Sequence, residues 1–203
     1  MFNFLYKNQV KEKVHNKTIF LFVGRNQQPE DLLSMYESNE CIKQNHNIIV
    51  ISPEDEWYPK PNGVTDQKKS VVKMQKTASV MKEFIRKTVQ KDNLNPNQII
   101  LSGFSAGAAV AMELFITNSY KAVICHNGTI LDIHNIKNAQ NQNQIFMIHN
   151  RDDNVFLWEE RYLPVKNTLL KQEYTVNVLE RTHGGHAIKK EDIDYVSVFL
   201  NQI

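Results

Sequence analysis

The sequence predicts a doubly wound α/β fold, in which a mostly parallel β-sheet is flanked by helices. Short apolar segments alternate along the chain with longer segments of helical period, which is the pattern of βαβ units. The short segments are rich in Ile, Val and Phe, as strands covered on both faces should be. The chain has 203 residues, of which 41% are hydrophobic and 23% are charged. We therefore expect one packed domain spanning residues 1–203.

Six short apolar segments are the candidates for the central strands. They are residues 18–23, 47–52, 98–102, 122–125, 145–149 and 174–179. We expect residues 1–6 to add an edge strand that opens the sheet. The connections between these strands leave no obvious material for a large lid, so the predicted fold is a minimal one.

The predicted helices lie between these strands, at residues 29–44, 66–91, 106–117, 157–172 and 190–201. The first begins with acidic residues, which suit a helix N-terminus. The second is amphipathic, with apolar residues spaced by three and four: Val71, Met74, Ala78, Met81 and Ile85. Its lysines alternate with these positions, so we interpret them as a solvated helix face: Lys68, Lys69, Lys73 and Lys76.

Charge and cysteine content restrict the classes of partner and compartment. The formal net charge is only +2, so we expect no nucleic-acid partner. Two cysteines, Cys41 and Cys125, are too few for a disulfide framework and favour a reducing compartment. The N-terminal residues lack the apolar core of a signal peptide, and no apolar run approaches the ~20 residues that span a bilayer. We expect a cytoplasmic protein without stable membrane insertion, and the sequence does not indicate its oligomeric state.

The pentapeptide GFSAG at residues 103–107 is the strongest chemical signal in the chain. It follows the predicted strand 98–102 and precedes the predicted helix 106–117, which begins with small residues. A strand–turn–helix of this kind holds the central serine in strained dihedrals and exposes its hydroxyl at a helix N-terminus. We therefore predict that Ser105 is a nucleophile.

A serine hydroxyl needs an imidazole to take its proton and a carboxylate to orient that imidazole. Two carboxylates, Asp152 and Asp153, follow a predicted strand downstream of Ser105. Two histidines, His183 and His186, lie further on in a glycine-rich segment. The chain order of serine, acid and histidine is the order found with this kind of serine turn.

These motifs resemble those of the phospholipase/carboxylesterase family of small α/β-hydrolases, which includes the acyl-protein thioesterases. The family pattern G-F-S-x-G-[GA] matches residues 103–108, an acid loop that begins H-G-x-x-D matches within residues 149–155, and G-H-x-[IV] matches residues 185–188. Carried over residue by residue, the resemblance selects Asp153 over Asp152 and His186 over His183. Asp152 is then interpreted as a solvated loop carboxylate.

Two further stretches extend the resemblance. The family pattern H-G-x-G-G-x-x-E-D-L aligns with residues 23–32, and W-Y-P aligns with residues 57–59. The first alignment implies an oxyanion hole formed by the backbone N–H groups of Arg25 and Ala106. The second places Trp57 and Tyr58 on a loop that we expect either to flank the substrate's acyl chain or to serve only for packing.

The chain departs from the family pattern in the two loops that face the site. Val23 replaces a histidine, Asn26 and Gln27 replace glycines, and Asn150 replaces the glycine of the acid loop. Glycine is often required where φ is positive, although Asn tolerates that conformation better than most residues. The substitutions leave open a degenerate enzyme that binds a ligand or partner without turnover.

Other chemistries are weaker alternatives. Four histidines, His126, His149, His183 and His186, suggest a metal only loosely, because they form no recognised ligand motif. Cys125 ends an apolar strand and is interpreted as a core cysteine rather than a nucleophile. We expect neither a metal nor a cofactor.

The function predicted from the sequence is hydrolysis of a carboxylic ester or thioester through an acyl-enzyme, with a small-molecule or acylated substrate. Ser105 would attack, His186 would transfer protons and Asp153 would orient the imidazole. Amide or peptide hydrolysis by the same residues is a third possibility, for which the sequence shows no dedicated specificity feature.

Overall fold

The computed structural model describes residues 2–7, 17–60, 64–139 and 144–203. Within these ranges the strands form one sheet in the order β1-β3-β2-β4-β5-β6-β7. The strand β1 is antiparallel to β3, and the other pairs are parallel. The strands are β1 (Phe2–Lys7), β2 (Thr18–Phe22), β3 (Asn47–Pro53), β4 (Ile99–Phe104), β5 (Ala122–His126), β6 (Gln144–Asn150) and β7 (Thr175–Arg181). The predicted doubly wound fold and its added edge strand are confirmed, and only Met1 of that strand lies outside the described residues.

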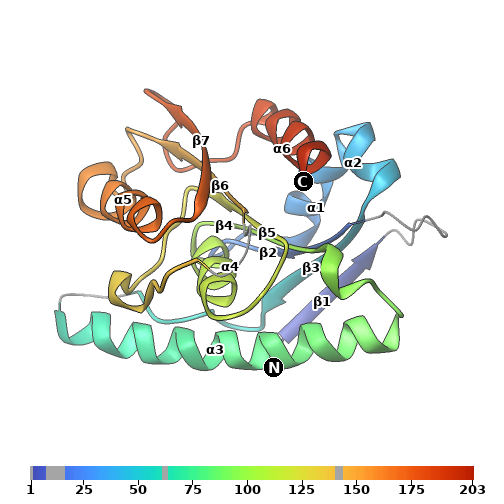
Figure 1. The fold of residues 1–203 in the computed structure, drawn as a ribbon, viewed down its shortest axis with the longest axis horizontal. Coiled ribbons are helices and arrows are strands. Elements are labelled where there is room, and N and C mark those ends of the chain that lie inside the picture. Colours follow the sequence, from blue (N-terminus) through green and yellow to red (C-terminus); the bar gives the residue numbers. More distant parts are fainter. Residues whose placement is uncertain (1, 8–16, 61–63, 140–143) are drawn as a thin grey trace.

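Helices cover both faces of the sheet (Figure 1). One face carries α1 (Pro29–Glu37), α2 (Glu40–Asn45) and α6 (Lys190–Gln202), and the other carries α3 (Val64–Lys91), α4 (Ala106–Thr117) and α5 (Leu163–Lys171). The short helices are η1 (Pro96–Gln98), η2 (Ile133–Asn135) and the π-helical turn η3 (Trp158–Tyr162). In the described ranges, no helix combines the length and apolarity needed to cross a membrane.

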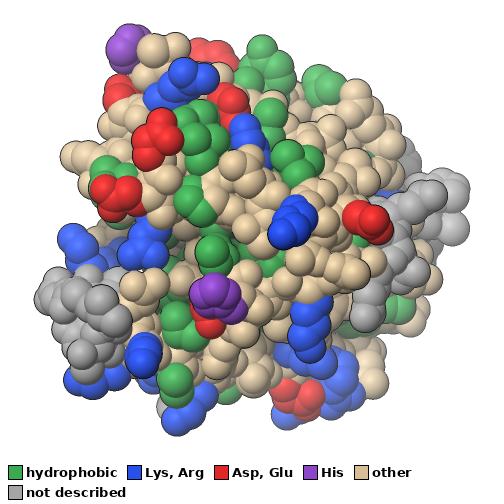
Figure 2. All heavy atoms as spheres, turned by 60° about the vertical axis from the view of Figure 1, so that its left-hand side comes forward, with side chains coloured by type: hydrophobic (Ala, Val, Ile, Leu, Met, Phe, Trp, Pro, Cys, Tyr) green, Lys and Arg blue, Asp and Glu red, His purple; other side chains and the backbone are tan. Residues whose placement is uncertain are grey.

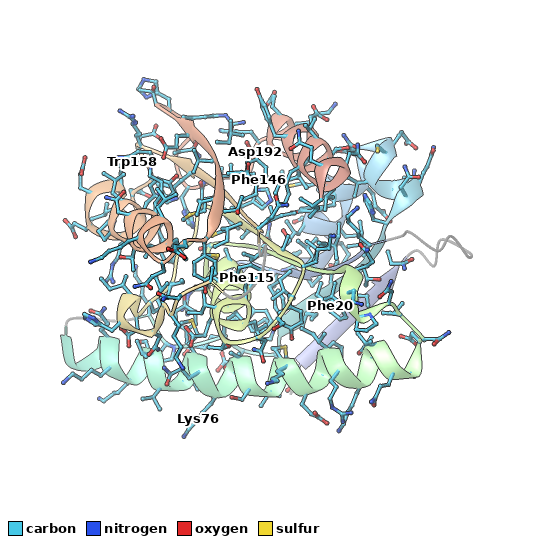
Figure 3. The ribbon with its side chains drawn as sticks, viewed as in Figure 1. Phe20, Lys76, Phe115, Phe146, Trp158 and Asp192 are labelled. Carbon is cyan, nitrogen blue, oxygen red and sulfur yellow. The ribbon has the colours of Figure 1, made fainter. Side chains whose placement is uncertain are left out.

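The buried apolar residues form one cluster that follows the strands and the inner faces of the helices. Phe20 and Phe115 lie on the α3 and α4 side of the molecule, and Phe146 lies on the α6 side (Figure 3). Phe146 packs against Phe199 of α6, with ring centroids 5.2 Å apart. Both faces of the sheet are therefore covered, which explains why the strands read as continuous apolar runs.

The predicted helix 29–44 is wrong as a single element, because the chain forms α1 and α2 instead. Asn39 interrupts it with extended dihedrals, φ −94° and ψ 111°. The Asn39 side chain accepts a hydrogen bond from the backbone N–H of Ile42 at 3.1 Å. This N-cap starts a new helix, and an asparagine at that position competes with helix continuation.

The predicted helix 157–172 is wrong in its first turn. Residues Trp158–Tyr162 form a π-helical turn, in which the N–H of Tyr162 donates to the carbonyl of Leu157 at 3.2 Å. The α-helix proper begins at Leu163. Single π turns occur frequently at functional sites.

The lysines of α3 point into solvent, as the alternation of charge predicted. Lys68, Lys69, Lys73 and Lys76 are all exposed. Lys76 extends from α3 away from the sheet (Figure 3). Basic side chains gather along the lower part of the face in Figure 2, the level at which α3 runs in Figure 1.

The strand order brings together loops that are far apart in the chain. From β2 the chain moves outward to β3 and then returns to place β4 on the other side of β2. The loops that follow β2 and β4 therefore face each other at the carboxyl edge of the sheet. This reversal of direction is where open α/β sheets bind ligands.

Candidate active site

Ser105 occupies the sharp turn between β4 and α4. Its dihedrals are φ 54° and ψ −118°, which lie in a strained region for a residue with a side chain. Its backbone N–H donates to the carbonyl of His126 at 3.0 Å, which fixes the turn to β5. The strand–turn–helix predicted from GFSAG is present.

The two glycines that flank Ser105 allow this turn to form. A Cβ atom added at Gly103 would lie 2.6 Å from the backbone carbon of Gly107. One added at Gly107 would lie 2.3 Å from the carbonyl oxygen of Phe22 in β2. Larger residues would push α4 away from the sheet, so the close approach of backbone to backbone requires glycine.

His186 links Ser105 to Asp153. Its Nδ1 lies 2.8 Å from Asp153 Oδ2, and its Nε2 lies 2.8 Å from Ser105 Oγ. Because an ionised carboxylate accepts hydrogen bonds and cannot donate them, Nδ1 carries the proton. Nε2 is then the acceptor for the serine hydroxyl. In this tautomer the imidazole is ready to take a proton from Ser105.

Asp153 is buried and fixed by its neighbours. Its side chain is fully shielded from solvent, and its second oxygen accepts the backbone N–H groups of Val155 at 2.8 Å and Phe156 at 3.0 Å. The Phe156 ring also stacks on His186 at a centroid distance of 6.1 Å. One loop therefore holds the carboxylate and covers the imidazole that it orients.

The loop that carries His186 is held by two side chains that the sequence did not single out for this role. Asn127 donates from Nδ2 to the carbonyl of Ala187 at 2.9 Å and to that of Gly185 at 3.2 Å. Asn150 donates from Nδ2 to the same Gly185 carbonyl at 2.8 Å. These contacts tie the histidine loop to the ends of β5 and β6.

Asp152 also anchors the histidine loop, while its side chain stays 42% exposed, in agreement with its interpretation as a solvated loop carboxylate. Its Oδ1 accepts the N–H of Gly185 at 2.7 Å and its Oδ2 accepts that of Gly184 at 3.2 Å. The hydrogen bond from Gly185 has the largest effect and lowers the pKa of Asp152, and the bond from Gly184 lowers it further. The His183 side chain is 85% exposed, with Nδ1 3.7 Å from Asp152 Oδ2, and lies outside the serine–histidine–aspartate chain.

The loop after β2 forms a tight turn opposite Ser105. The N–H of Gly24 donates to the Gln27 side chain at 2.8 Å, and the N–H of Gln27 donates back to the Gly24 carbonyl at 3.3 Å. Asn26 has φ 58°, so the position does require a left-handed conformation. The altered residues Asn26 and Gln27 thus build this turn rather than disrupt it.

Arg25 and Ala106 line the cleft that contains Ser105 and His186. Among the described residues, neither backbone N–H has a hydrogen-bond partner. The Ala106 N–H lies at the N-terminus of α4, where the helix carries partial positive charge. The Arg25 side chain pairs with Glu56 and donates to the Tyr58 carbonyl at 2.7 Å, which fixes the loop that follows β2 to the loop that follows β3.

Trp57 and Tyr58 have different positions. Trp57 is buried, and its indole N–H donates to the carbonyl of Val23 at 2.8 Å, so it supports the loop after β2 and does not line the cleft at Ser105. Tyr58 does line that cleft, although little of its side chain is exposed. The predicted contact with the substrate's acyl chain is therefore kept for Tyr58 and dropped for Trp57.

The other histidines and the cysteine considered from the sequence have contacts outside the serine–histidine–aspartate chain. His126 accepts from or donates to the Tyr36 hydroxyl at 2.8 Å, and burial lowers the pKa of His126 to about 3. His149 stacks on Tyr162 with centroids 4.5 Å apart. Burial raises the pKa of the Cys125 thiol to about 12, as for a core cysteine. Within the described ranges, no three His, Cys, Asp or Glu side chains are grouped as metal ligands.

The sheet, the flanking helices and the turn at Ser105 define an α/β-hydrolase. The chain belongs to the phospholipase/carboxylesterase family, whose model matches residues 9–203. It is therefore an enzyme of the esterase class. No curated protein matches the sequence significantly.

Three solved structures of similar fold, two from bacteria and one from a plant, illustrate the likeness. The carboxylesterase of Bacillus cereus has 15% identity and a TM-score of 0.83, with 100% of this chain and 94% of that chain covered. A phospholipase/carboxylesterase of Dyadobacter fermentans has 17% identity and a TM-score of 0.81, with coverage of 99% and 97%. Acyl-protein thioesterase 2 of Zea mays has 16% identity and a TM-score of 0.75, with coverage of 100% and 98%. At these identities the likeness establishes the fold.

Proposed function

We propose that Ser105, His186 and Asp153 form a catalytic triad that hydrolyses carboxylic esters or thioesters. The observation that carries this proposal is the position of His186, which is within 2.8 Å of both Ser105 Oγ and Asp153 Oδ2. Such a chain of contacts activates a serine hydroxyl that is otherwise a weak nucleophile.

The reaction proceeds through an acyl-enzyme. His186 Nε2 takes the Ser105 proton as Oγ attacks the acyl carbonyl, and Asp153 stabilises the imidazolium that forms. His186 then protonates the departing alkoxide or thiolate, which leaves the acyl group on Ser105. Water attacks this ester while His186 takes its proton. His186 then returns that proton to Ser105 Oγ as the carboxylic acid leaves, which regenerates the free enzyme.

The oxyanion of each tetrahedral intermediate is stabilised by the backbone N–H groups of Arg25 and Ala106. Two features support this assignment: both residues line the cleft at Ser105, and neither N–H is committed to another described residue. Loss of one donor from such a hole costs ~10²–10³ in rate. Asn26 adopts the positive φ of the turn although it stands where the family pattern has glycine. Because the turn opposite Ser105 is formed, an active enzyme is favoured over the silent alternative.

The cleft favours small or acylated substrates. It has a volume of about 360 Å³, and its apolar lining includes Tyr58, Leu131 and Phe156. No large lid covers it in the described part of the chain. Soluble esters, lysophospholipids and acylated side chains fit these features. We propose action in the cytoplasm, supported by Cys41 and Cys125 as free thiols.

Hydrolysis of p-nitrophenyl esters, acyl thioesters and matched amides tests the proposal. We expect turnover of the esters or thioesters, and a fall of at least about 10³-fold in kcat for Ser105→Ala. Ser119→Ala, at an exposed position outside the site, is the matched control and should retain the native rate. Ligand retention with no turnover of any of these substrates would support the silent alternative instead.

A further inference from the structure

The lining of the cleft at Ser105 includes positively charged residues. The described lining includes three cations, Arg25, Lys60 and Arg161, and no Asp or Glu. The cleft also holds the nucleophile Ser105 and the imidazole of His186. A substrate that enters it therefore meets an apolar wall and a set of cations beside the reacting serine.

The three cations differ in whether their charge is balanced. Arg25 is paired with Glu56. Lys60 and Arg161 form no ion pair or side-chain hydrogen bond with any residue in the described ranges. Glu159 and Glu160 precede Arg161 in the chain, but neither lines the cleft.

Basic residues near this region that serve the fold have visible partners. Lys166 pairs with Glu180 at 2.6 Å, and Arg181 pairs with Asp192. The Arg151 guanidinium lies over the Trp158 ring, 4.9 Å from its centroid. Within the described part of the chain Lys60 and Arg161 show no such contact, and both line the cleft.

Arg161 is carried by a fixed segment. It belongs to the π-helical turn Trp158–Tyr162, where the stacked rings of Tyr162 and His149 hold the backbone. The Tyr162 hydroxyl also donates to Glu180 at 2.7 Å. Arg161 and Tyr58 both line the cleft. The positive charges of Arg25 and Arg161 oppose the effect of burial, which raises the pKa of Tyr58.

We propose that this enzyme selects acyl esters or thioesters that carry a carboxylate group, bound by Lys60 and Arg161. The inference rests on the proposed function and names the substrate class of the same site. Guanidinium and ammonium groups beside an apolar wall bind such anions through charge-assisted hydrogen bonds. The apolar lining then accommodates the carbon chain that joins the anion to the reacting carbonyl.

Paired substrates test the proposal. The first pair is p-nitrophenyl pentanoate and mono-p-nitrophenyl glutarate, in which a carboxylate replaces the terminal methyl of the acyl chain. The second pair keeps the pentanoyl group and adds a carboxylate to the nitrophenyl leaving group. The ratio of kcat/KM for the anionic over the neutral member reports the selectivity, and the pair that shows it identifies the side of the ester on which the anion lies.

The native enzyme should prefer the anionic member of at least one pair. In the double variant Lys60→Gln and Arg161→Gln this preference should fall by about 10-fold or more, the effect of losing a hydrogen bond to a charged group. Added salt should also reduce it. Lys76→Gln, which removes an exposed lysine of α3, is the control and should leave the preference unchanged.

Two results would overturn the inference in different ways. Ser105-dependent hydrolysis without preference for either anion, or with a preference that the double variant retains, contradicts the anion site and leaves the triad standing. Failure to hydrolyse any member of either pair contradicts the proposed function and this inference together. Labelling of the double variant by a small neutral fluorophosphonate establishes that it is folded at the active site.

Discussion

Asn26 shows how one residue shapes the loop opposite Ser105. Its φ of 58° is a conformation that costs an ordinary side chain about 1–2 kcal/mol, but that Asn adopts more readily. The neighbouring N–H of Arg25 is the proposed oxyanion donor. The geometry of the loop and the stabilisation of the intermediate are therefore coupled through this position.

Substitution of Asn26 tests this coupling. Asn26→Gly should retain activity and unfold at a similar temperature, because glycine adopts positive φ without strain. Asn26→Val should lose about 1–2 kcal/mol of stability and at least about 10-fold in kcat, because a β-branched residue resists that conformation. Thermal unfolding and ester hydrolysis measure the two effects, and equal behaviour of the two variants would refute the coupling.

Asn150 contacts the histidine loop directly, although the two are far apart in the sequence. Its amide donates to the Gly185 carbonyl at 2.8 Å, and a Cβ atom added at Gly184 would lie 2.5 Å from Asn150 Cγ. We predict that Asn150→Ala lowers kcat about 10-fold with little change in KM, since His186 loses part of its support. The exposed Asn154 is the control, and Asn154→Ala should behave as the native enzyme in steady-state kinetics. Parallel losses in both variants would argue against a specific role.

Sequence reasoning reached the three residues of the serine–histidine–aspartate chain, because local patterns surround each of them. It missed the anchoring roles of Asn127 and Asn150. Their partners lie 35 to 60 positions away, and these contacts exist only once β5, β6 and the histidine loop are packed. The bonds that Asp152 accepts from Gly184 and Gly185 were missed for the same reason.

At the scale of elements, α4 is unusual in being buried along nearly its whole length, including the side chain of Glu113. Burial raises the pKa of Glu113 to about 7, and the negative charge of Asp132 adds to this effect. The folded protein therefore keeps a proton on this carboxyl in a pH range where the unfolded chain releases it.

Glu113 makes stability depend on pH. Between about pH 4.5 and pH 7 the folded state binds more protons than the unfolded state. The contribution of protonated Glu113 to the free energy of unfolding is therefore fully present at low pH and is lost as the pH rises. Glu113→Gln cannot ionise. The stability of this variant relative to the native protein should rise by on the order of 3 kcal/mol between pH 4.5 and pH 8. Urea unfolding at several pH values measures this, and a constant difference between the two proteins would contradict it.

The sequence predicted the existence and type of most elements better than their boundaries. Apolar runs marked the central strands, and spacings of three and four residues marked α3. The break at Asn39 and the π turn at Trp158–Tyr162 were missed. Both arise from individual hydrogen bonds that override a continuous helical pattern.

At the scale of the whole molecule, the order of the strands assembles the site. The loops after β2, β4, β5 and β6 and the histidine loop after β7 meet at one edge of the sheet. Alternation of strands and helices predicts a parallel sheet but not which strand lies beside which. Only the folded arrangement explains why Arg25, Ser105 and His186 line one cleft.

Covalent labelling by a fluorophosphonate, located by mass spectrometry, tests the central claim most directly. The probe reacts with a serine hydroxyl only when that hydroxyl is activated. We expect one adduct, on Ser105 of the native chain, much slower labelling in His186→Ala, and none in Ser105→Ala. An adduct that persists unchanged in Ser105→Ala would show that the nucleophile lies elsewhere.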